Sequence, residues 1–467
     1  MNTRLCIRSI LLATSLAAAP LGVAPLAGAA DLGSIYQQAL KNDPLIREAE
    51  ANRLAARESK PQALAALLPQ LSAGAGYDDS EASGSSTFFQ PSPFQIFTRD
   101  TDRQTERTSW EVTLRQNVFR WENWAALRRA DHEAAQAESD YVAAQQDLVL
   151  RTSEAYFNVL AAQDTLEAAQ AAHDAIARQL EQSEKRFEVG LIAVTDVQEA
   201  KAAFDSATAA LIQAKRNLAT AQEQLRELTG ETFDELSRPG PDMPLAGPNP
   251  ANAEDWVQLA MNQNARLISS RLAADITRQS ISSERGGHFP SIDLLVSRSS
   301  FDIKSDLTTG GFSGPNDSDS KDTSINLQLT VPLYSGGATA SRVRQAEYLH
   351  RAARERLERT ARQTERETRD AYLGVNSEVA RVQSLRQAVE SAKTALQATE
   401  AGYEVGTRTS VDVLDARRRL FEAQTNYARS RYDYLLNVLR LRLAAGTLDD
   451  QGIADINAIL TENVRIK

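Results

Sequence analysis

The chain has 467 residues, of which 42% are apolar and 24% charged, and its formal net charge is −10. An acidic chain without a block of basic residues is a poor match to nucleic acid, so nucleic acid is not expected as a partner. Long stretches rich in Ala, Gln, Glu and Arg contain almost no Gly or Pro, which is typical of long helices. Beyond the N-terminus no apolar run reaches the roughly 18 residues of a membrane-spanning helix. Membrane-spanning strands leave a weaker pattern in the sequence, so this observation does not exclude them.

Residues 1–30 have the features of a signal peptide. Two arginines precede an apolar stretch at 10–19, which prolines then interrupt, and small residues at 27–30 offer a cleavage site, so we expect cleavage near Ala30. Cys6 is the only cysteine of the chain. The mature chain is therefore expected to have no disulfide, no reactive thiol and no N-terminal cysteine that could carry a lipid.

After this segment the predicted elements follow the same order twice. In the first half, 31–238, they are a helix at 33–68, a strand at 70–78, a loop at 79–107, a strand at 108–120, and helices at 122–188 and 195–229. In the second half, 251–446, they are a helix at 253–287, a strand at 291–301, a loop at 302–322, a strand at 323–334, and helices at 338–404 and 411–445. The Pro/Gly-rich stretch 239–250 is the expected linker, and the tail 447–467 is expected to form short surface structure.

The two halves also match residue by residue. Segments 187–190 and 403–406 read Phe-Glu-Val-Gly and Tyr-Glu-Val-Gly, 216 positions apart. An aspartate, Asp196 or Asp412, follows nine residues after each aromatic residue. Duplication of a unit of about 215 residues explains this pattern, and it predicts two structural repeats in each chain.

The alternating segments predict strands. In 323–334 the apolar residues Ile325, Leu327 and Leu329 face one way and polar residues face the other. About ten residues suit a tilted strand that crosses a bilayer. Four strands per chain cannot close a barrel, and open edges are not tolerated in lipid, so several chains would have to pool their strands. A soluble four-stranded sheet fits the alternation equally well.

Aromatic residues favour the membrane interpretation. Phe119, Trp121 and Trp124 cluster where the strand at 108–120 ends, as expected of an aromatic belt at a membrane interface. The helices add a length scale, because a helix of about 67 residues is about 100 Å long. Such helices must pack lengthwise, as in coiled coils. The two shorter helices of each half together match the long one, which predicts the wall of a cylinder.

The turns between the last two helices of each half carry the most specific pattern. Gly190 and Gly406 stand where a helix should end in a left-handed residue. Thr195 and Thr409 then match the first position of a capping box. Each pair of helices is therefore predicted to form a tight helical hairpin.

Three aspartates follow these turns: Asp196, Asp412 and Asp415. One interpretation is that they complement the positive ends of the helix dipoles, worth under about 1 kcal/mol each. A sharper hypothesis is that Asp412 and Asp415, three residues apart, line one face of a helix. Repeated by rotational symmetry, they would form rings of carboxylates at the narrow end of a tube.

Five strings carry a family resemblance: IYQQA at 35–39, LPQL at 68–71, AYFNVL at 155–160, VGLIAVTDVQ at 189–198, and the segment 402–416. With them the chain resembles, from Asp31 to about Ile459, the TolC family of outer membrane channel-tunnels. The resemblance implies a homotrimer in the outer membrane, with a 12-stranded β-barrel that continues into a 12-helix periplasmic α-barrel. It implies an exit duct for tripartite efflux pumps and type I secretion, with periplasmic adaptor proteins and inner membrane pumps as partners.

The resemblance also implies a closed periplasmic tip that opens when its helices untwist. It suggests links that hold the tip closed: Asp196 with Tyr403 and Gln179 with Glu400 within a chain, and Thr195 and Asp196 with Arg408 between chains. Asp412 and Asp415 match the aspartate rings of the family's aperture.

Two other classes of function are alternatives to such a duct. A soluble periplasmic coiled-coil adaptor would share the helical hairpins but would not need two pairs of strands. An enzyme is not expected, because the four histidines are scattered and neither the HExxH nor the GxSxG motif occurs. We accordingly predict no catalytic site, no cofactor and no metal.

Overall fold

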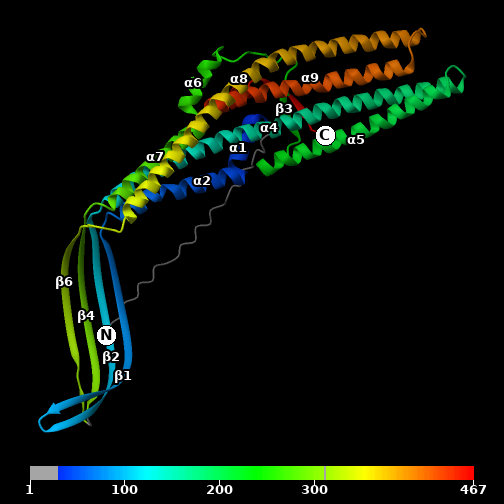
Figure 1. Cartoon of the computed structure of the whole chain (residues 1–467). Coiled ribbons are helices and arrows are strands. Elements are labelled where there is room, and N and C mark those ends of the chain that lie inside the picture. The colour runs from blue at the N-terminus through cyan, green and yellow to red at the C-terminus, as the bar shows by residue number, and fades with distance from the viewer. Residues whose placement is uncertain (1–29, 310–311, 467) are drawn as a thin grey trace, which may run out of the picture.

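The computed structural model describes residues 30–309 and 312–466. The predicted signal peptide, apart from its last residue, and Cys6 lie outside this range. Figure 1 shows a bundle of long helices and a curved sheet that leaves one end of the bundle. Within the described residues no helix is both long and apolar enough to cross a membrane.

The sheet is antiparallel throughout. Its strands are β1 (Gln70–Pro91), β2 (Phe94–Phe119), β4 (Ser291–Thr309), β5 (Phe312–Pro315) and β6 (Ser318–Thr330). β2 lies between β1 and β4, and β5 and β6 both pair with the other side of β4. The loops predicted at 79–107 and 302–322 are therefore largely wrong, since most of these residues extend the strands. The sequence pattern does not reveal them because apolar and polar residues do not alternate in these extensions, while the ladder of backbone hydrogen bonds continues.

The long helices match their predictions to within one residue. They are α4 (Trp121–Glu188) and α8 (Ala338–Glu404), followed by α5 (Val194–Thr229) and α9 (Ser410–Ala445). The helices expected at 33–68 and 253–287 are instead broken into α1 (Leu32–Asn42), α2 (Pro44–Arg57) and α3 (Ser59–Ala65), and into α6 (Ala253–Gln263) and α7 (Ala265–Gly286). At each first break an extended residue, Asp43 or Asn264, ends one helix and caps the next with its side chain.

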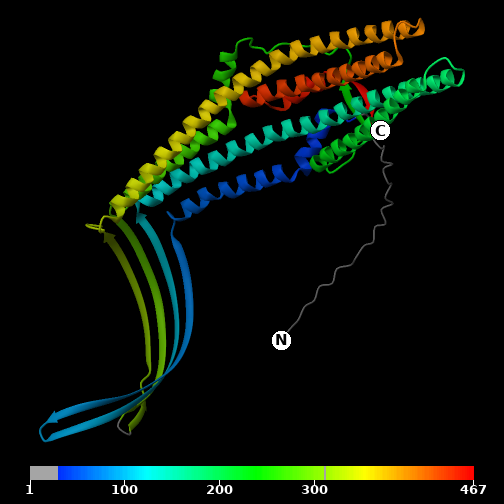
Figure 2. The same ribbon diagram turned by 45° about the vertical axis from the view of Figure 1, so that its right-hand side comes forward.

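The shorter helices lie lengthwise against the long ones, as their lengths predicted. α2 and α5 follow successive parts of α4, while α7 and α9 follow α8 (Figures 1 and 2). The main core lies midway along this bundle, where Tyr156 and Phe157 of α4 meet Leu435 and Leu439 of α9. Full burial of such side chains stabilises the fold by about 2 kcal/mol each.

The C-terminal tail is more than surface structure. α10 (Asp450–Asn457) buries Ile453 and Ile456, and β7 (Leu460–Arg465) pairs antiparallel with β3 (Glu235–Pro239). The sequence pattern predicted neither β3 nor β7, because two short strands far apart in the chain carry no local turn signal. Their sheet closes over the middle of the bundle.

Candidate functional site

The helical tip lies at the end of the molecule opposite the sheet, where the α4–α5 and α8–α9 hairpins turn (Figure 1). Gly190 and Gly406 have φ of 76° and 78°, as predicted for left-handed residues. Leu191 N–H donates to the Arg186 carbonyl at 2.9 Å, and Thr407 N–H donates to the Gly402 carbonyl at 2.8 Å. A Cβ on either glycine would have no atom within 4 Å, so backbone conformation alone requires glycine there.

The two helix starts differ. Thr409 caps α9 as predicted, because its hydroxyl accepts from Asp412 N–H at 3.2 Å while the Asp412 carboxylate accepts from Thr409 N–H at 2.9 Å. The capping box predicted at Thr195 is wrong. α5 begins one residue earlier, with Ala193 as its N-cap and no side-chain hydrogen bond there.

Both predicted ring aspartates already have partners within the chain. Hydrogen bonds from Thr409, led by that of its backbone N–H, hold the pKa of the Asp412 carboxyl below its ordinary value. Asp415 is paired with Arg418 at 3.0 Å, one turn further along α9. The lowered pKa keeps the Asp412 carboxylate ionised near neutral pH, and the Arg418 guanidinium offsets part of the charge of Asp415.

Neither link expected within a chain is formed in this structure. The Tyr403 hydroxyl is buried without a hydrogen-bond partner among the described residues, and its ring lies 5.1 Å from the Arg186 guanidinium instead of binding Asp196. The Gln179 amide nitrogen is likewise buried and unpartnered within the described chain. Glu400, its expected partner, accepts from Arg417 at 2.8 Å.

Arg417 is a tip residue that the sequence reasoning missed. Besides Glu400 of α8, it donates to the Ala175 carbonyl of α4 at 2.9 Å, so one guanidinium joins three helices. The run of three arginines at 417–419 was a visible signal. Which of them points inward depends on how the helices pack, and the sequence alone does not give that.

Unpartnered polar groups gather at this tip. Ser183 of α4 and Ser410 at the start of α9 have buried hydroxyls that, like Gln179 and Tyr403, find no partner in the described part of the chain. Leaving such a group unpaired costs about 1–3 kcal/mol. The residues of the main apolar core lie nearer the middle of the bundle, so this core contributes little to the packing of the tip.

The sheet at the other end separates apolar from polar side chains. One row across four paired strands is Leu71, Leu114, Val296 and Ile325. The adjacent row, on the opposite face, is Ser72, Thr113, Ser297 and Ser324. A sheet with one apolar face and one polar face has the pattern of outer-membrane strands, whose apolar side chains point outward and whose polar side chains point inward.

The apolar face has the height of a membrane. On β1 it runs from Leu71 to Tyr77, about 20 Å at 3.3 Å per residue, close to the apolar band of about 25 Å in outer-membrane sheets. Its side chains are open to the surroundings, with Leu71 70% and Ile325 75% exposed. Just past Tyr77 the cross-strand pair Asp79 and Glu106 ends the band.

The aromatic residues at the junction of strands and helices divide into two groups. Phe119, Trp124 and Phe289 are exposed, as an interfacial belt requires. Trp121 differs from the prediction, because its indole N–H donates to the Ser282 carbonyl at 3.1 Å and its ring packs edge-on against Phe289. It fastens the two strand-to-helix junctions to each other.

The model of the family described as outer membrane efflux proteins matches residues 35–231 and 256–447. The chain belongs to this family. The resemblance predicted from the sequence strings is thereby confirmed, and the efflux protein is an outer-membrane protein. A coiled-coil adaptor is not favoured.

Relatives cover almost the whole efflux protein. It is 39% identical over 430 residues to the outer membrane protein TolC of Vibrio cholerae, covering 92% of this chain and 94% of that protein. It is 29% identical over 417 residues to the alkaline protease secretion protein AprF of Pseudomonas aeruginosa, covering 89% and 84%. The solved Campylobacter jejuni CmeC outer membrane channel shares the fold, with a TM-score of 0.71, 18% identity, and 92% and 90% coverage. The efflux protein thus serves outer-membrane efflux, and its relatives are channel and secretion proteins, not enzymes.

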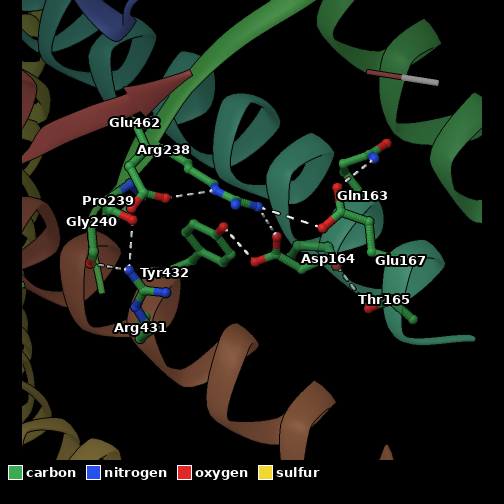
Figure 3. A network of polar contacts seen from close by, with 11 residues as sticks. Gln163, Asp164, Thr165, Glu167, Arg238, Pro239, Gly240, Arg431, Tyr432 and Glu462 are labelled. Carbon is green, nitrogen blue, oxygen red and sulfur yellow. Dashed lines mark hydrogen bonds and ion pairs between the residues drawn. The ribbon is translucent and has the colours of Figure 1, made fainter. Parts of the chain in front are cut away.

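A polar network fastens the β3–β7 sheet to the middle of the efflux protein's bundle (Figure 3). Tyr432 of α9 donates to the Asp164 carboxylate of α4 at 2.7 Å, and Arg238 of β3 pairs with the same carboxylate at 3.4 Å. Arg238 also pairs with Glu462 of β7 at 3.2 Å. Burial raises the pKa of Asp164 above its ordinary value, although the hydrogen bond from Tyr432 and the charge of Arg238 oppose this shift.

Asp164→Ala is expected to destabilise the efflux protein by about 3 kcal/mol, because it leaves Arg238 short of a partner in a half-buried site. Glu167→Gln is the matched control, since Glu167 is a more exposed partner of Arg238 at 3.6 Å and should cost under about 1 kcal/mol. The midpoint of helix loss in denaturant, followed by circular dichroism, measures both. Equal midpoints for the two variants would contradict the fastening role.

The raised pKa also sets a pH dependence. A carboxyl group whose folded pKa lies above its unfolded value of 3.8 binds more protons in the folded state between the two values. Its contribution to stability is therefore greatest below that unfolded pKa and falls as the pH rises through the folded pKa.

Proposed function

We propose that three copies of the efflux protein pool their sheets into one closed 12-stranded barrel and their helices into a 12-helix tunnel. The observation that carries this proposal is the sheet itself, which combines an apolar face of membrane height with two open edges. Within the described residues, β1 pairs only with β2, and β6 pairs only with β4. Open edges cannot face lipid, so β1 of one copy would have to pair with β6 of the next.

Each half of the chain supplies equal parts of this assembly. The repeats 31–238 and 251–446, joined by the linker 239–250, each provide one long helix with shorter helices along it, which gives four columns per chain. The described part of the tail, 447–466, covers the middle of the bundle with α10 and β7. Such a tunnel is a passive exit duct for tripartite efflux pumps and type I secretion systems. The name of the alkaline protease secretion relative supports the secretion role, and we infer periplasmic adaptors and inner membrane pumps as the partners of the duct.

The helical tip is the gate of the duct. Arg408 and Thr195 are exposed and Asp196 is half-buried at the turns, so Arg408 can reach the Thr195 and Asp196 of a neighbouring copy. The buried, unpartnered Gln179 and Tyr403 would gain Glu400 and Asp196 as partners when the helices twist. A few directional links of this kind are enough to bias a tip that has two arrangements.

Membrane extraction separates the duct from the adaptor. The mature efflux protein should stay in the membrane pellet after high-salt and alkaline washes, because only detergent replaces lipid around an apolar strand face. In detergent, light scattering combined with size exclusion should give the mass of three chains. Release by salt, or the mass of a single chain in a folded sample, would overturn the proposal.

A further inference from the structure

The far end of the β1–β2 hairpin forms a separate two-stranded ribbon. β4 pairs with β2 only from Thr101 onward, and Thr101 lies opposite Gly84, so Ser85–Pro91 and Phe94–Asp100 have no third strand among the described residues. Figures 1 and 2 show this ribbon bending away from the line of the sheet, past the ends of β4 and β6. We call residues 85–100 the aromatic ribbon.

Both faces of the aromatic ribbon are apolar near its tip. The register pairs Phe88 with Phe97 on one face and Phe89 with Ile96 on the other. The Phe89 and Phe94 rings lie 5.6 Å apart. All five side chains are between 47% and 82% exposed.

Such a ribbon needs a covering partner. A two-stranded hairpin without packing is marginally stable in water, and contiguous exposed apolar surface generally marks an interaction site. A strand with only one face covered would carry polar residues on the other face. The aromatic ribbon carries phenylalanine on both faces, so both faces need a packing partner.

The bilayer is too far away to provide that cover. The apolar band of β1 ends at Tyr77, and Phe89 lies twelve residues further on, about 40 Å along the strand. Between them the outward row carries Asp79, Glu81, Asp100 and Asp102. The gap of about 40 Å between Tyr77 and Phe89 exceeds the roughly 25 Å height of the apolar band.

We propose that the aromatic ribbons of neighbouring copies pack against one another over the far end of the duct, forming a shared apolar cap. The inference rests on the proposed trimer. β1 is the edge strand that must meet a neighbouring copy, so the ribbon continues the seam between chains. From Ala82 to Thr98 the chain has no charged residue, so identical tips meet without the repulsion that like charges would cause.

A single-cysteine variant tests the cap in the whole mature protein, which is expected to have no other cysteine. The mass of the Phe89→Cys variant in detergent is measured first. The variant is then oxidised and analysed on a denaturing gel without reductant. About two of every three chains should shift to a covalent dimer, the limit for one cysteine per chain in a trimer, because Cβ atoms must approach to about 4 Å for a disulfide. Ser83→Cys, in the polar part of the same strand, should form no covalent dimer. If Phe89→Cys fails to fold, Phe94→Cys should give the same shift to a covalent dimer.

The contrary outcomes are distinguishable. Trimeric mass without covalent dimers at either tip position would overturn the cap and leave the duct intact. A fluorescent label on the Phe89→Cys variant that is quenched by lipid-attached quenchers would also overturn it, because the ribbon would then lie in the bilayer. If a water-soluble quencher quenches the label and no covalent dimer forms, the ribbon is exposed to water. That outcome would overturn the cap and leave the ribbon as a surface for a different partner protein. The mass of one chain would overturn both the cap and the proposed trimer.

Discussion

Arg408→Ser, combined with Tyr403→Phe, should raise the conductance of single channels by loosening the closed tip. Arg408 is exposed at the α8–α9 turn, and in the proposed trimer it would bind Thr195 and Asp196 of a neighbouring copy. Loss of three equivalent links of about 1 kcal/mol each would shift the balance between closed and open tips by on the order of 100-fold. Current through the purified protein in a planar bilayer measures this change.

A matched control separates gating from charge. Arg419→Ser removes a positive charge from an exposed site on α9, away from the proposed links, and should leave the closed conductance unchanged. Tyr403→Phe alone removes a hydroxyl that has no partner in the described part of the single chain. Any effect of that variant on current would therefore come from the closed assembly. Equal closed conductance in wild type and the double variant would refute the gating roles.

Asp412→Asn with Asp415→Asn should weaken the preference of the channel for cations and its block by multivalent cations. Asparagine is chosen because the Asp412 carboxylate also completes the capping box of α9, and an asparagine oxygen can keep accepting the Thr409 N–H. The reversal potential in a salt gradient measures the preference. An unchanged reversal potential would rule out the carboxylate rings.

The pairing of Asp415 with Arg418 provides an opposite test. Removing the guanidinium in Arg418→Gln frees the Asp415 carboxylate, and cation preference should then rise instead of fall. The two changes move the reversal potential in opposite directions only if these side chains line the path of the ions. A general loosening of the tip would move both in the same direction.

The sequence predicted the long helices well because their signals are local. Gly190 and Gly406 end α4 and α8 through their left-handed backbone, and Thr409 starts α9 with its side chain. The sequence predicts the strands correctly where apolar and polar residues alternate. It ends them too early where that alternation disappears, although the backbone pairing continues.

The tip was only partly predictable. The family resemblance named Gln179, Glu400 and Tyr403, yet Glu400 binds Arg417 in this structure. Arg417 reaches three helices at once, and such a contact depends on how the bundle packs in three dimensions. The β3–β7 sheet was missed for the same reason, since its strands lie more than 200 residues apart in the chain.

The most direct test of a gated outer-membrane duct is the current through the purified wild-type protein in a planar bilayer. We predict that it inserts and gives small, stable, cation-selective steps, as expected of a continuous tunnel narrowed at its tip by carboxylates. A folded protein that never inserts, or one that gives large unselective steps from the outset, would contradict the central claim.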